Sequence, residues 1–73
     1  MEEVQIGSRV TVQQDFHEPI TYEIVGEGES NPEQLKISYL SPLGAALLHH
    51  LTGDVVVVIT PDETFKVKLL SIE

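Results

Sequence analysis

The sequence contains no cysteine and no tryptophan, and it has only four basic side chains. Without cysteine, neither a disulfide nor a thiolate zinc site can support the fold. With only two phenylalanines and two tyrosines, the core has to be aliphatic. No apolar run approaches the roughly 20 residues of a membrane-spanning helix, and no signal peptide is visible. We therefore expect a cytoplasmic protein that does not enter a membrane.

Positive charge is the scarcest property of the chain. The four basic residues are scattered along the sequence: Arg9, Lys36, Lys66 and Lys68. The chain has 12 acidic side chains, so its net charge is −8. Nucleic-acid binding needs Lys and Arg concentrated enough to neutralise phosphates. We therefore predict no direct sequence-specific binding of nucleic acid. An acidic surface favours solubility, and it can also steer the domain towards a basic patch on another protein.

Motifs for catalysis and metal binding are also missing. The chain has no Cys nucleophile, no G-x-S-x-G elbow, no phosphate-binding Gly loop and no HExxH. The acidic segment 26–34 lacks the spacing of an EF-hand, so we interpret it as a solvated loop. His49 and His50 are adjacent, and neighbours on a helix diverge by about 100°, so they cannot jointly bind one metal. We interpret both as surface side chains near a helix end, and we predict no metal site.

Alternating apolar residues predict the first two strands of one small domain. Ile6, Val10 and Val12 share one parity, which predicts a half-buried strand over residues 7–15. Residues 20–25 alternate in the same way and should pair with the first strand as an antiparallel hairpin. A domain of this size buries only about 60% of its unfolded surface, so we expect modest stability.

The second half of the chain adds three extended segments. Residues 35–40 form a short extended piece. The uninterrupted β-branched run 55–59 is typical of a strand that is covered on both faces or central in a sheet. Residues 65–72 alternate until the parity breaks at Leu69 and Leu70, which indicates a bulge or a strand end.

Residues 42–51 have the signals of one short helix. Ser41 is a good N-cap, Pro42 suits the first helical position, and Gly53 can stop the helix. Gly44 lies within the apolar arc, where the missing side chain lets the helix approach the sheet closely. The leucines of this arc are Leu43, Leu47, Leu48 and Leu51. Runs of strands with a single helix predict an α+β fold, with the helix on one face of an antiparallel sheet of four to five strands.

Five motifs in this order resemble the C-terminal domain of Gre-type (GreA/GreB) bacterial transcription elongation factors. They read GSRVTVQ, YEIVGEGES, KISYLSPLGAALL, TGDVVVVITP and FKVKLLSI, and they extend over residues 6–72. Any one of them alone would be a weak signal, but the ordered set is specific. The resemblance implies a single FKBP-like domain over residues 1–73, with a curved antiparallel sheet around one short helix.

The resemblance also implies a partner. In the family this domain docks on the β′-subunit coiled coil at the rim of the RNA polymerase secondary channel. The Ser-Pro helix start of the family belongs to that docking surface and corresponds here to Ser41, Pro42 and Leu43. Glu29 holds the position of the family's loop glutamate. An acidic residue often precedes Ser-Pro in the family, and Leu40 stands at that position here.

The family's transcript cleavage needs acidic residues on a separate N-terminal coiled-coil hairpin, where they help to hold magnesium. This chain lacks that hairpin. We therefore expect an RNA polymerase-binding module of a transcription elongation factor that is not an enzyme and uses no cofactor. Two alternatives are a peptidyl-prolyl isomerase, suggested by the FKBP-like scaffold alone, and a general protein-interaction module. We expect a monomer, with weak self-association through a sheet edge as the alternative.

Overall fold

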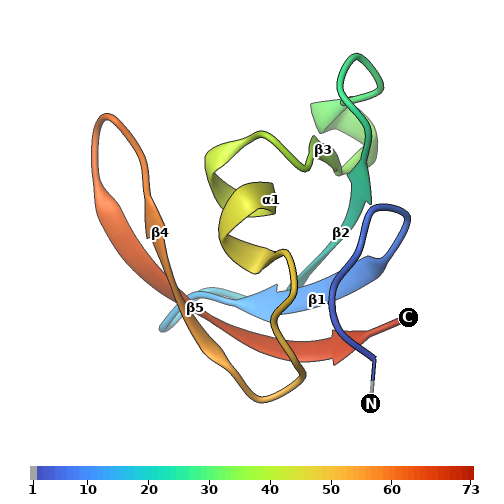
Figure 1. Ribbon diagram of the computed structural model, residues 1–73. Helices are drawn as coiled ribbons and strands as arrows, with labels where there is room; N and C mark the ends of the chain where they lie inside the picture. The colour runs from blue at the N-terminus through green and yellow to red at the C-terminus, as the bar shows by residue number, and fades with distance from the viewer. Residues whose placement is uncertain (1) are drawn as a thin grey trace.

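The computed structural model describes residues 2–73, which form one sheet of five strands that curls around a short helix (Figure 1). The strand order across the sheet is β3-β2-β1-β5-β4. In chain order the elements are β1 (Arg9–Gln13), β2 (Ile20–Val25), the 3₁₀ helix η1 (Pro32–Gln34), β3 (Lys36–Ser38), α1 (Pro42–Leu47), β4 (Val55–Ile59) and β5 (Thr64–Ile72). No helix in this described part is long and apolar enough to cross a membrane.

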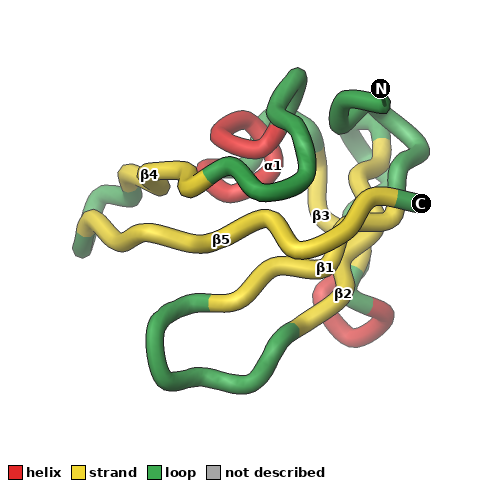
Figure 2. Tube along the Cα trace, turned by 90° about the horizontal axis from the view of Figure 1, so that it is seen from below, coloured by secondary structure: helices red, strands yellow, loops and turns green. Residues whose placement is uncertain are grey.

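The core lies between α1 and the concave face of the sheet. Figure 2 shows α1 on one side of the strands, and Leu47 of this helix is fully buried against them. The inward positions of the strands are aliphatic, as the alternation predicts. The buried cluster consists of Val4, Val10, Val12, Ile24, Leu47, Val56, Val58, Val67 and Leu69. The α+β class with a curved sheet and one helix is thus confirmed.

One strand pair departs from the antiparallel sheet that we expected. β2 and β3 run parallel, with Ile24 opposite Ile37 and Val25 opposite Ser38. Two consecutive strands can run parallel only if the connection between them returns the chain to the end of the sheet at which the first strand began. Residues 26–35 supply it, and they include η1 and Leu35 in a left-handed conformation (φ 58°). The sheet is therefore mixed.

The helix is shorter than the predicted range 42–51 and ends at Leu47. His49 takes a left-handed conformation (φ 70°) that no α-helix can contain. The N-terminal segment competes for this part of the chain: the His49 amide donates to the Val4 carbonyl at 2.8 Å, and the Val4 amide donates to the His50 carbonyl at 3.0 Å. The histidines therefore lie after the helix, contrary to the prediction that they sit on its last turn.

The N-terminal segment also corrects the predicted start of the first strand. The strand covers Arg9–Gln13 rather than 7–15, and Ile6 is 56% exposed while Val4 is fully buried. A turn at Ile6 and Gly7 (Gly7 φ 98°) separates this segment from Arg9–Gln13, so the parity of the strand does not extend back to Ile6. Sequence alternation alone cannot register such a turn, because it assumes a continuous strand.

β4 occupies the edge of the sheet, although its uninterrupted β-branched run indicated a covered or central strand. Its inward residues Val56 and Val58 are buried, whereas Val55, Val57 and Ile59 are 61%, 48% and 71% exposed. The bulge predicted near Leu70 is present, since the register between β1 and β5 shifts at this position.

Candidate docking site at the helix start

The parallel pairing of β2 and β3 brings the predicted site residues to one end of the sheet. Parallel strands point the same way, so the segments that follow them leave the sheet at the same end of the strands. The loop with Glu29 follows β2, and the turn with Leu40 and Ser41 follows β3. The Tyr39 amide continues this pairing by donating to the Val25 carbonyl at 3.0 Å. If β3 were antiparallel to β2, the start of the helix would lie at the opposite end of the strands.

Ser41 is held by hydrogen bonds that fix the start of α1. Its Oγ accepts from the Gly44 amide at 3.0 Å and donates to the Ser38 carbonyl at 2.7 Å. The Ser38 Oγ in turn accepts from the Leu40 amide at 3.0 Å. The predicted N-cap is therefore confirmed, and it is tied to the end of β3 as well as to the helix. These hydrogen bonds restrain the backbone conformation around Leu40 and Pro42.

Gly44 confirms the close approach of helix and strand that the sequence predicts. A Cβ at this position would overlap the Ser38 carbonyl oxygen and approach Ser41 Oγ at 3.0 Å. Gly44 is buried within the first turn of α1. Only glycine leaves room for the Ser38 carbonyl to accept from Ser41 at this point.

The residues of the predicted docking surface differ in exposure. Leu40 is 56% exposed and Pro42 is exposed, so both offer apolar contact area at the helix start. Ser41 is half-buried, because its hydroxyl is used by the cap. Leu43 is half-buried against the core cluster and acts mainly as an anchor. Glu29 is exposed in its loop, and its Oε1 would lie 2.8 Å from a Cβ at Gly26, so the carboxylate folds back over its own turn.

A small cleft lies beside Leu43. It has a volume of about 140 Å³, and its lining includes the apolar side chains of Leu43 and Phe65, with Tyr22, His17 and Glu18. Ligand sites usually have volumes of about 300–1,000 Å³. The volume of this cleft lies below that range.

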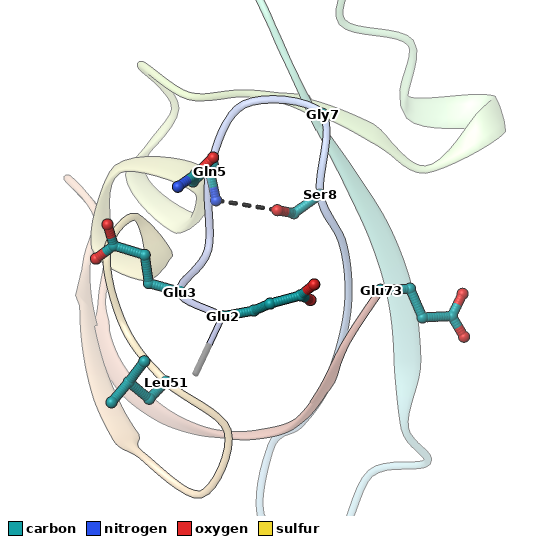
Figure 3. A pocket seen from close by; sticks show the side chains of 7 residues that line it. All are labelled: Glu2, Glu3, Gln5, Gly7, Ser8, Leu51 and Glu73. Carbon is teal, nitrogen blue, oxygen red and sulfur yellow. Dashed lines mark hydrogen bonds between the residues drawn. The ribbon is translucent and has the colours of Figure 1, made fainter.

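A larger hollow of about 490 Å³ lies beside the N-terminal segment (Figure 3). Glu2, Glu3 and Glu73 line it, but Figure 3 shows that the carboxylates of Glu3 and Glu73 point away from its centre. Within residues 2–73, no three His, Asp or Glu side chains converge as a metal site would require. This hollow therefore offers no set of ligands that point to a bound ion.

The histidines after α1 take part in local contacts that the sequence analysis missed. His50 Nδ1 lies 3.0 Å from Asp54 Oδ2, and the Leu51 amide donates to the same oxygen at 2.9 Å. The Leu51 amide, followed by the His50 hydrogen bond, lowers the pKa of Asp54 below its usual value. His49 Nδ1 lies 3.5 Å from Glu3 Oε2. The i, i+4 spacing of His50 and Asp54 was the signal available in the sequence.

The fold and this site define a small α+β domain with an exposed helix start that is capped by Ser41. The chain belongs to the GreA/GreB family of bacterial transcription elongation factors, as a C-terminal domain. The family described as "Transcription elongation factor, GreA/GreB, C-term" matches residues 1–73. The resemblance inferred from the five motifs is thus confirmed.

Individual relatives agree with this assignment. Transcription elongation factor GreA 1 of Lactiplantibacillus plantarum is 42% identical over 73 residues, which cover 99% of this chain and 47% of that protein. GreA of Roseiflexus castenholzii is 50% identical over 72 residues, which cover 97% of this chain and 46% of that protein. The chain thus spans about half the length of the curated relatives it matches.

Solved structures of the family share the fold. GreA factor homolog 1 (Gfh1) of Thermus thermophilus superposes with a TM-score of 0.83 at 32% identity, over 99% of this chain and 49% of that one. The elongation factor GreA/GreB of Nitrosomonas europaea gives a TM-score of 0.75 at 25% identity, over 94% of this chain and 58% of that one. Both structures therefore share the fold of this chain.

Proposed function

We propose that this domain binds bacterial RNA polymerase through the start of α1, on the β′-subunit coiled coil at the rim of the secondary channel. The contact residues are Leu40, Ser41, Pro42 and Leu43, with Glu29 in the loop at the same end of the sheet. In this role the domain is a cytoplasmic docking module of a transcription elongation factor. It supplies no catalytic group and no cofactor of its own.

The observation that carries the proposal is the capped Ser-Pro helix start. Leu40 and Pro42 are exposed on a backbone that the Ser38 and Ser41 side chains hold in place through three hydrogen bonds. A preorganised surface loses little conformational entropy on binding, which favours affinity. The net charge of −8 favours encounter with a basic surface. Membership of the elongation-factor family supports RNA polymerase as the source of that surface.

Two matched variants test the assigned surface. Leu40→Lys and Val57→Lys each replace an aliphatic side chain that is about half exposed, at 56% and 48%, with the same added charge. We expect Leu40→Lys to weaken binding to core polymerase about tenfold or more, which corresponds to about 1.4 kcal/mol. Val57 lies on the outer face of β4, so Val57→Lys should bind like the wild type. Fluorescence anisotropy of labelled domain titrated with core polymerase measures both affinities.

A polymerase lacking the tip of the β′ coiled coil provides the control on the partner side. Wild-type domain should lose its affinity for this polymerase. Equal affinities of Leu40→Lys and wild type would disprove the assigned surface, provided that thermal unfolding shows both to be folded. Undiminished binding to the truncated polymerase would disprove the coiled coil as the docking site.

A further inference from the structure

β4 is an open edge strand without the features that usually protect one. Its five residues are all β-branched and aliphatic, and its outward side chains Val55, Val57 and Ile59 are all exposed. Natural proteins usually protect such edges with a charge, a proline or a bulge on the strand itself. In the described part of the chain, β4 pairs only with β5. One row of its backbone N–H and C=O groups therefore faces outward along the edge.

The opposite edge of the same sheet is protected. β3 has only three residues, Lys36–Ser38, and Lys36 places a charge on it. The chain also folds back there, since the Asn31 and Lys36 amides each donate to the other's carbonyl, at 2.9 and 3.0 Å. The contrast between the two edges confines an unsatisfied strand to β4.

The sequence of β4 is self-complementary in an antiparallel register. If Val57 lies on a two-fold axis, Val55 of one copy faces Ile59 of the other, and Val56 faces Val58. Cross-strand partners share a face of the sheet. The exposed side chains Val55, Val57 and Ile59 would then meet on the outer face, and the buried Val56 and Val58 would meet on the inner face. No charged side chain lies within the strand to oppose this pairing.

We infer that β4 pairs with β4 of a second copy to form a symmetric dimer with a continuous ten-stranded sheet. Such a pairing is isologous and closes on itself, because each copy uses its single open edge. The turn after β4 carries Asp62 and Glu63, and the two-fold axis would bring it to the end of the partner's hairpin that carries both Asp54 and Lys68. Charges of both signs therefore lie at each end of the interface.

The size and charge of the interface predict weak association. A stable interface buries about 800 Å² on each partner, and the edge of one five-residue strand with three exposed side chains covers less than this. Two copies of net charge −8 also repel each other. Salt screens this repulsion but leaves apolar contact and hydrogen bonds in place. We therefore expect a dimer that strengthens with salt, with a dissociation constant above about 10 µM.

Sedimentation equilibrium tests the dimer with the same pair of variants in exchanged roles. The wild-type domain is examined from about 10 µM to about 1 mM protein, at NaCl concentrations of about 0.05 and 0.5 M. We expect a monomer–dimer equilibrium that shifts towards dimer at the higher salt. Val57→Lys places two charges on the axis and should remain monomeric, whereas Leu40→Lys, with the same change in charge, should dimerise like the wild type.

NMR locates the contact within the chain. Amide signals of Val55–Ile59 should shift as the protein concentration rises, while those of Lys36–Ser38 should stay constant. A wild type that remains monomeric at about 1 mM in both salts would disprove the inference, as would oligomers larger than a dimer. Equal behaviour of the two variants would also disprove it. The polymerase titration reads a separate surface, so either proposal can fail without the other.

Discussion

Asp54 shows how a single residue organises the connection between α1 and β4. One carboxylate oxygen accepts from both the Leu51 amide and His50 Nδ1, at 2.9 and 3.0 Å. Both hydrogen bonds favour the charged form of Asp54, which lowers its pKa, with the Leu51 amide as the larger cause. The sequence shows the adjacent histidines, but their pattern did not predict Asp54 as a partner of His50, because Asp54 lies beyond the expected end of the helix.

The lowered pKa of Asp54 makes part of the stability depend on pH. A carboxyl group with a lowered folded-state pKa contributes stability above its unfolded value of 3.8 and loses it as the pH falls through the folded value. We expect NMR titration to give a pKa below 3.8 for Asp54 in the wild type. His50→Gln should retain most of the lowering, because the Leu51 amide remains. A pKa at or above 3.8 would contradict this account.

At the scale of elements, the packing of α1 on β3 depends on a missing side chain. Gly44 sits where a Cβ would overlap the Ser38 carbonyl, and this carbonyl also accepts from the Ser41 hydroxyl. Local propensity and tertiary contact therefore make opposite predictions for an alanine at this position. The sequence placed Gly44 in the helical arc facing the sheet, and the structure identifies the atom that it approaches.

Gly44→Ala distinguishes the two effects by the sign of the change in stability. Helix propensity alone would stabilise the variant by about 1 kcal/mol, whereas overlap with the Ser38 carbonyl should lower the free energy of unfolding by about 1–3 kcal/mol. Urea denaturation measures the difference. Ala45→Gly, at an exposed position of the same helix, should cost about 1 kcal/mol through propensity alone. A stabilised Gly44→Ala would show that the helix shifts freely on the sheet.

Across the whole molecule, charge is segregated. The scattered basic residues of the sequence all lie on the outer face of the sheet: Arg9 pairs with Glu23, Glu23 with Lys36, and Lys66 and Lys68 lie opposite the outward Val57 and Val55. Of the acidic residues in the described part, only Glu23 lies within a strand. The acidic residues therefore surround the sheet from loops and chain ends, and they repel one another with few cations between them.

This repulsion predicts how salt affects stability. At pH 7 the net charge is −8, so screening by NaCl should raise the melting temperature. Near the isoelectric point of about 4.6 the net charge vanishes, and the rise should largely disappear. Thermal unfolding followed by circular dichroism, at about 10 µM protein where few copies associate, measures both cases. A melting temperature independent of NaCl at pH 7 would contradict the expectation.

Local signals in the sequence determined several features of this protein. Alternation specified the strand Ile20–Val25, the cap at Ser41 with Pro42 after it specified the start of α1, and the parity break specified the bulge at Leu70. Each depends on neighbours within a few residues, so the chain itself contains the necessary information. The ordered motifs were also sufficient to identify the family.

Tertiary structure decided the rest, because it depends on partners distant in sequence. Val4 ends the helix early by pairing with the segment after it, and only the folded chain brings the two together. The direction of β3 depends on the path of residues 26–35. Because β3 runs parallel to β2, Glu29 and Leu40 lie at the same end of the strands. The same β-branched run would suit a central strand or an edge. The sheet order places β4 at the edge, where its outer face is exposed.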